Sequence, residues 1–258
     1  MIGEAEVIER LRQIATAPEA RGLPDDVAVL DGFVITHDTI AEDVHFLPCD
    51  PPASVGWKLV AVNLSDLAAK GASPAGGLLS LTLAGDGTWE SEFLTGVEHA
   101  CESYGLPLIG GDTIALPQGA PRVLGLTAIG RGGRRVPERA GGKAGDGLWL
   151  VGSLGDAAAG LALLRKDSRA SGPLVDIYRR PVPQLGAGEV LAPHAHAMMD
   201  VSDGLLADAG HIGEASGCAV AVALDRLPLS AAARAWLDDQ PDRPAALAAL
   251  ASGGDDYE

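Results

Sequence analysis

The chain has 258 residues, 47% of them apolar, so it is long enough for one large domain or two ordinary ones with a substantial core. Its formal net charge of −16 argues against a nucleic-acid partner, which a basic face would attract. No apolar run approaches the roughly 18 residues of a membrane span, and the N-terminus lacks a signal-peptide pattern. With three widely spaced cysteines, these features predict a cytoplasmic protein with reduced thiols and no membrane partner.

Apolar periodicity divides the first half of the chain into helices and strands. Asp31-Gly32, which lies between two apolar runs, is a strong signal for a two-residue hairpin. The predicted helices cover residues 4–15, 55–70 and 90–104, and the predicted strands cover residues 27–30, 33–36, 78–83, 106–109 and 123–130.

The helix predicted over residues 55–70 carries two different stripes. Val60, Leu64 and Leu67 belong to an apolar face, whereas Asn63, Asp66 and Lys70 recur at i, i+3 and i+7 on another side.

Residues 131–147 are rich in Gly and Arg and poor in large apolar residues, so we place a domain boundary there, between residues 1–136 and 137–258. The turn at 152–156, between a strand and a helix, is a weak candidate for phosphate binding. The second unit is predicted to contain helices near 157–165, 186–192, 203–215, 230–238 and 244–251, with Ser202 or Asp203 as the N-cap of the third, and strands at 148–151, 197–201 and 220–224. The fold class is therefore α/β, as two α+β units.

Single acids recur at the ends of apolar segments or within them. In the clearest case, an apolar pair reads as the end of a strand, Gly110-Gly111 as a tight turn, and Asp112 as a carboxylate placed just beyond it. An Asp pair in a turn is ordinarily solvated, but the repetition suggests carboxylates gathered around metal ions. The acids in this pattern are Asp25, Asp26, Asp38, Asp66, Asp112, Asp200, Asp203, Asp255 and Asp256.

Five segments that carry these acids resemble, in their order, the bacterial thiamine-monophosphate kinase family, a branch of the aminoimidazole ribonucleotide synthetase superfamily. The segment Asn63–Pro74 is the most specific of them. The family continues for several tens of residues beyond the last motif, so the resemblance implies a C-terminal unit that is incomplete. The five segments are 38–46, 58–74, 110–113, 200–205 and 253–258.

The resemblance implies a two-domain fold whose N-terminal unit has a mixed sheet and forms a homodimer. It also implies transfer of a phosphoryl group from ATP to thiamine phosphate, in line and with Mg²⁺. Such a reaction needs positioning and charge neutralisation more than a covalent nucleophile. The implied metal ligands are Asp25, Thr36, His37, Asp38, Asp66, Asp112, Asp200 and Asp203, with Asp112 and Asp38 at the catalytic centre.

The same resemblance assigns the substrate contacts. The residues implied for ATP are Tyr104, Gly111, Asp112, Arg139 and Ser202, and those implied for thiamine phosphate are His45 and Asp255. Two alternatives stay open at this stage. The chain could be another ATP-dependent member of the superfamily, or a protein that binds Mg²⁺ and nucleotide without turnover.

Overall fold

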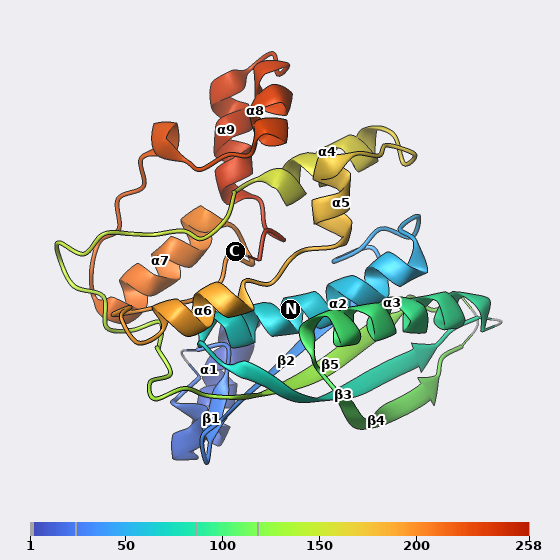
Figure 1. Cartoon of the computed structure of the whole chain (residues 1–258), viewed down its shortest axis with the longest axis horizontal. Helices are drawn as coiled ribbons and strands as arrows, with labels where there is room; N and C mark the ends of the chain where they lie inside the picture. The colour runs from blue at the N-terminus through green and yellow to red at the C-terminus, as the bar shows by residue number, and fades with distance from the viewer. Residues whose placement is uncertain (1–2, 24, 86, 118, 258) are drawn as a thin grey trace.

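The computed structural model describes residues 3–23, 25–85, 87–117 and 119–257, so Glu258 of the last motif lies outside the described residues. A sheet in the first half of the chain lies beneath a layer of helices, and the second half is stacked above that layer (Figure 1). Among the described residues, no helix is long and apolar enough to cross a bilayer.

The sheet of the first unit has five strands in the order β1-β2-β5-β3-β4. β3 and β4 run parallel and the other neighbours antiparallel, so the sheet is mixed, as expected. The Asp31-Gly32 hairpin joins the first two strands as predicted, with positive φ at both residues. The strands are β1 (Ala28–Leu30), β2 (Phe33–Ala41), β3 (Ser73–Leu83), β4 (Leu108–Ala115) and β5 (Val123–Arg131).

The prediction of a turn at Gly110-Gly111 is wrong, because β4 continues through both glycines and through Asp112. Gly111 has φ +153°, and a Cβ on it would lie 2.0 Å from the carbonyl oxygen of Leu79 on β3. The glycine therefore permits the two strands to approach each other, whereas the sequence pattern suggested a turn.

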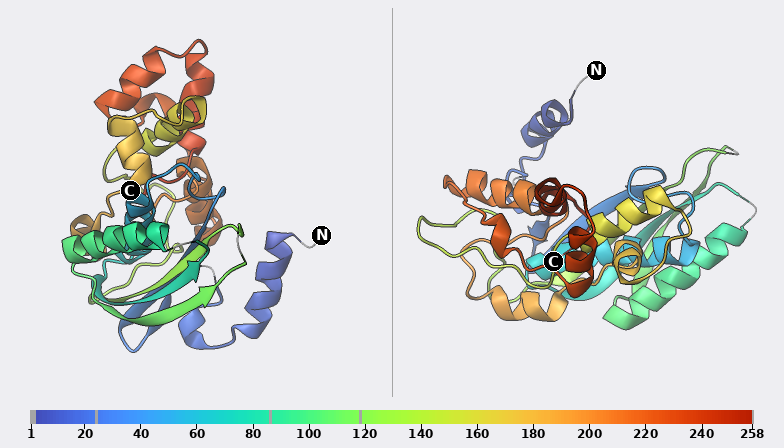
Figure 2. Two further views of the ribbon diagram at one scale, coloured as in Figure 1. Left: turned by 90° about the vertical axis from the view of Figure 1, so that its right-hand side faces the viewer. Right: turned by 90° about the horizontal axis from the view of Figure 1, so that it is seen from above.

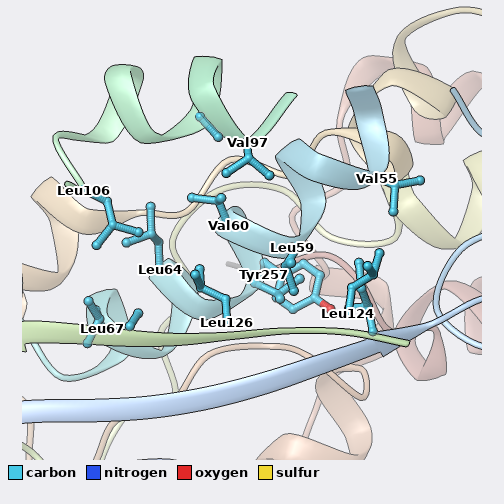
Figure 3. Close-up of a cluster of buried hydrophobic side chains, with 14 of the residues drawn as sticks. Val55, Leu59, Val60, Leu64, Leu67, Val97, Leu106, Leu124, Leu126 and Tyr257 are labelled. Carbon is cyan, nitrogen blue, oxygen red and sulfur yellow. The ribbon is translucent and has the colours of Figure 1, made fainter. Parts of the chain in front are cut away.

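Helices α2 (Pro52–Ala69) and α3 (Thr88–Tyr104) cover one face of the sheet (Figure 1). α2 is buried almost throughout, and Leu59, Leu64 and Leu67 are inaccessible to solvent. Figure 3 shows these side chains between α2, α3 and β5, with the ring of Tyr257 from the last segment of the chain among them. The core of the first unit thus includes a residue from the second.

The predicted N-terminal helix is confirmed as α1 (Glu4–Ile14), followed by the 3-10 turn η1 (Pro18–Ala20). α1 is set apart from the remaining elements in both views of Figure 2. Its apolar residues Leu11 and Ile14 are 47% and 75% exposed, so the described chain leaves these side chains of the helix uncovered.

The five helices predicted in the second unit are all present, but the three predicted strands are not formed in its described residues. Residues 148–151, 197–201 and 220–221 instead line a cavity of about 850 Å³. A strand requires a neighbour that accepts its ladder hydrogen bonds, and these segments pair with none here. The helices are α4 (Asp156–Lys166), α5 (Pro173–Arg179), α6 (Leu185–Leu191), α7 (Leu205–Ser216), the 3-10 turn η2 (Leu224–Arg226), α8 (Ala231–Asp238) and α9 (Arg243–Ser252).

Two glycines allow the backbones of α2 and α3 to touch. A Cβ on Gly56 would lie 2.1 Å from the carbonyl oxygen of Phe93, and one on Gly96 would lie 1.9 Å from that of Ala53. Because backbone atoms cannot move aside as a flexible side chain does, we expect Gly96→Ala to lower the free energy of unfolding by about 3 kcal/mol.

Gly210→Ala in α7 is the matched control, since nothing lies within 4 Å of its added Cβ. The free energy of unfolding of that variant should rise by roughly 0.5–1 kcal/mol, because alanine has a higher helix propensity than glycine. Denaturant titration of both variants measures the difference, and an equal effect in the two would contradict close contact between α2 and α3.

Candidate active site

Three carboxylates from distant segments converge above the sheet. Asp26 precedes β1, Asp66 projects from α2, and Asp200 lies in the loop before α7. One oxygen of each lies within 4.8 Å of the others. Asp66 belongs to the stripe of Asn63, Asp66 and Lys70 that the sequence showed on this helix.

Neighbouring side chains fix the positions of these acids. The Thr36 hydroxyl donates a short hydrogen bond to Asp66, and the Ser65 hydroxyl donates to Asp200 at 2.7 Å. β1 pairs with β2 only as far as Ile35, so the later N–H groups of β2 on that edge have no strand partner. The Asn63 side chain accepts one of them, from Asp38, at 2.9 Å.

Crowding and burial make Asp66, Asp200 and the nearby Asp38 difficult to ionise. Burial first, and then the charges of Asp200, Asp38 and Asp26, raise the pKa of Asp66 well above its ordinary value. Burial and the charge of Asp26 raise the pKa of Asp200 to about 7. Burial, Asp26 and more weakly Asp203 raise the pKa of Asp38. The environment of these three carboxyls therefore disfavours their ionised form.

The structure corrects the prediction for the first Asp pair. Asp25 was expected to bind metal, but its buried carboxylate pairs with the buried Lys70 at 2.5 Å and with Arg21 at 3.4 Å. Its neighbour Asp26 lies in the cluster instead, where Arg139 contacts both of its oxygens. The sequence showed the pair but contained no signal for which member joins Asp66 and Asp200.

Asp112 is also displaced from its expected place. Asp38 pairs with Leu126, a fully buried core residue. Asp112 pairs with Ser80, which pairs in turn with Gly125, the neighbour of Leu126 on β5. Because successive residues of a strand point to opposite faces, Asp112 and Asp38 lie on opposite faces of the sheet. They are also three strands apart, about 14 Å, so one chain does not bring them together.

His37 is another correction. Its neighbour Thr36 is buried toward α2, so His37 points to the other face of the sheet. There its ring nitrogens lie 2.9 Å from the hydroxyl oxygen of Thr127 and 3.2 Å from that of Thr39. The side chain therefore does not join the carboxylate cluster.

The residues expected to contact ATP are divided between two places. Arg139 and Ser202 lie near the cluster, the latter with its N–H bound by Asp208 at 3.0 Å. Tyr104 ends α3 and packs edge-on against Trp57, with ring centroids 5.5 Å apart. Gly111 is on β4. Tyr104 and Gly111 therefore do not lie with Arg139 and Ser202.

Both residues expected to contact thiamine phosphate lie near the buried Lys58 of α2. The ammonium group of Lys58 is 2.9 Å from the carbonyl oxygen of His45 and 2.9 Å from the carboxylate of Asp255. The structure therefore brings together two residues that are far apart in the sequence.

The start of α7 differs from the predicted cap. The N-cap is Gly204, with φ +102° and no side-chain cap, rather than Ser202 or Asp203. Asp208 accepts from the N–H groups of both predicted residues, at 3.0 and 3.1 Å. Ligand atoms of Asp203, Asp208 and His211 also lie within 4.8 Å of one another.

The candidate phosphate site at the start of α4 is occupied by a carboxylate of the chain. Asp256 accepts from the N–H groups of Gly155 at 2.7 Å and Ala157 at 3.2 Å. The side chain of Asp256 thus satisfies N–H groups that a helix start leaves without partners within the helix. Nothing in this geometry supports the phosphate interpretation.

The donor set fits hard divalent cations. Carboxylate oxygens are the ligands that Mg²⁺ prefers, and it uses few of them because substrate phosphates complete its coordination. Asp26, Asp66 and Asp200 provide such a set, and Asp38 and Asp203 add negative charge nearby.

Comparison with known proteins identifies the class. The model of the AIR synthase related protein, N-terminal domain, matches residues 24–132, and that of the C-terminal domain matches residues 143–251. The chain therefore belongs to the AIR synthase-related proteins.

Individual relatives narrow this class. The thiamine-monophosphate kinase of Caulobacter vibrioides is 41% identical over 93% of this chain and 70% of its own length, and that of Salmonella typhimurium is 39% identical over 98% and 79%. The chain belongs to the thiamine-monophosphate kinase family, whose members are ATP-dependent phosphotransferases.

Solved structures agree with this assignment. AaThiL complexed with AMPPCP and TMP has a TM-score of 0.89 and 30% identity, and covers 99% of this chain and 83% of its own. The thiamine-monophosphate kinase of Stenotrophomonas maltophilia has a TM-score of 0.76 and 35% identity, and covers 98% and 82%.

The carboxylate at the start of α4 leads to a test by pH. Burial raises the pKa of Asp256 from 3.8 to about 7, so the folded state holds this proton more tightly than the unfolded state does. The free energy of unfolding of the wild type, relative to that of Asp256→Asn, should therefore fall as pH rises from about 4 to about 7 and then level off. Chemical denaturation across this range measures the difference.

Asp239→Asn, at an exposed position after α8, is the control and should give a flat difference. A flat or rising difference for Asp256→Asn would show that this carboxyl is not held in the protonated form.

Proposed function

We propose that the cluster of Asp26, Asp66 and Asp200, with Asp38 and Asp203 beside it, holds Mg²⁺ for direct in-line transfer of the γ-phosphoryl group of ATP to thiamine phosphate. The observation that carries this proposal is the convergence of three carboxylates whose charge nothing in the cluster balances fully. When bound, Mg²⁺ would neutralise the phosphates and align them. The relative complexed with AMPPCP and TMP supports the choice of substrates.

The residues of the chain then position the two substrates for this transfer. A phosphate oxygen of thiamine phosphate attacks the γ-phosphorus, the bond to the β–γ bridging oxygen breaks, and ADP leaves. The attacking oxygen is already anionic, so no strong base is required. Arg139 and Ser202, beside the cluster, are proposed for ATP, and Asp255 offers its carboxylate to the cationic ring of thiamine.

Replacing Asp66 separates catalysis from stability. Asp66→Asn should lower kcat roughly 100-fold or more at saturating Mg²⁺ and ATP, because a negative ligand is lost. Its free energy of unfolding without Mg²⁺ should be equal to or above that of the wild type, because the raised pKa shows that the charge is unfavourable there. Steady-state formation of thiamine diphosphate and chemical denaturation measure the two effects.

Asp176→Asn on α5 removes an exposed acid and should change neither quantity. A near-normal rate in Asp66→Asn would place the metal site elsewhere.

We further propose that two copies associate through the first unit, residues 1–136. The sheet face opposite α2 exposes Leu78, Ile114 and Val123, which are 39%, 52% and 46% accessible. β4 is also an edge strand, with backbone groups unpaired on its outer side. Asp112 lies on this face, so the roles proposed for it depend on the second copy, because one chain does not bring it to the cluster.

A charge placed on this face tests the association. The wild type should be a dimer in light scattering at micromolar concentration, and Ile114→Lys should be a monomer, because a desolvated lysine opposes the contact. Val190→Lys on α6, where the valine is 68% exposed, is the control and should remain dimeric. A monomeric wild type would refute this proposal.

A further inference from the structure

The last described segment of the chain, residues 253–257, is held in an unfavourable backbone conformation. Asp255 has φ +71° and Tyr257 has φ +55°, a region that residues with side chains rarely adopt. Such strain persists only where the surroundings impose it, and it concentrates at functional sites. The contacts that impose it here come from both units.

Several of these contacts hold the segment without involving the half-buried carboxylate of Asp255. The N–H groups of Asp255 and Tyr257 donate to Ser202 and Val201 at 2.9 and 2.8 Å. Asp256 binds the start of α4. The Tyr257 ring lies in the core of the first unit beneath α2, as Figure 3 shows. The backbone is thereby fixed, but the direction of the Asp255 carboxylate needs contacts of its own.

Lys58 provides the decisive contact with this carboxylate. It is only 2% exposed, and its ammonium group is 2.9 Å from Asp255 Oδ2, 2.9 Å from the His45 carbonyl oxygen and 4.2 Å from the centre of the Tyr178 ring. The Tyr257 hydroxyl donates to the other oxygen of Asp255, at 3.1 Å. Both carboxylate oxygens are thus held from within, while the side chain stays 23% exposed.

We propose that Lys58 is a positioning residue for thiamine phosphate, which fixes Asp255 and the His45 segment in one arrangement for the incoming substrate. The inference rests on the proposed function. A buried ammonium must be paired, and removing it leaves its partner carboxylate free to turn toward water. The lysine acts through these two segments and does not itself touch the reacting phosphates.

The test uses Lys58→Met, which keeps the length of the side chain and removes its charge. The KM for thiamine phosphate should rise at least tenfold, with the KM for ATP within twofold. Hydrogen exchange at the Asp255 and Tyr257 amides should become faster. Tyr257→Phe, which removes only one hydroxyl, should raise the KM for thiamine phosphate about threefold and keeps the test valid if Lys58→Met folds poorly.

Lys70→Met is the matched control, because Lys70, the C-cap of α2, is also a buried lysine paired with an aspartate, but contacts neither His45 nor the 253–257 segment. It should lose stability without a change in the KM for thiamine phosphate or in exchange at residues 255 and 257. Equal KM values in the wild type, Lys58→Met and Tyr257→Phe would overturn the positioning role alone. Similar increases in the KM for thiamine phosphate in Lys58→Met and Lys70→Met would also overturn it, since a general loss of packing around α2 would then be the cause. A wild type that binds Mg²⁺ and ATP but does not turn over thiamine phosphate would overturn the proposed function as well.

Discussion

The nearly complete burial of α2 is the constraint on which the rest of the structure depends. A helix covered by the sheet, by α3 and by the second unit cannot direct polar groups into water, so each of them must find a partner inside. Asn63 binds the backbone of β2, Lys70 pairs with Asp25, and Lys58 pairs with Asp255. Only Asp66 lies among other acids instead of facing a cation. The helix that organises the core therefore also presents the residue that most needs a bound cation.

This arrangement explains why adjacent residues have different roles. Asp25 neutralises a buried lysine, and Asp26 turns toward Asp66 and Asp200. Arg139 partly balances Asp26, whereas neither Asp66 nor Asp200 forms an ion pair within the part of the chain that the structure describes. Structural ion pairs and crowded carboxylates thus lie one residue apart, and only the crowded ones have the electrostatic character of a cation site.

Local patterns in the sequence predicted the helices, the hairpin and the polar stripe of α2, because these depend on periodicity and turn chemistry within a few residues. Interactions between distant segments were not predictable in the same way. The strand order that separates Asp112 from Asp38 depends on pairing between β3, β4 and β5. The side of the sheet that His37 faces depends on which residues of β2 point toward α2. The acids near His37 in the sequence did not indicate this. The strands predicted in the second unit fail for a related reason, since a sequence shows extended propensity but not the presence of a neighbour.

Tyr257 is a residue of the second half of the chain that lies in the core of the first. The two halves consequently share one hydrophobic core at this point, and neither can lose its packing without exposing part of the other. They should therefore melt as a single cooperative unit, even though each matches its own family model. A ligand bound to the first half would then also raise the melting temperature of the second, because the ligand stabilises the folded state of the whole cooperative unit.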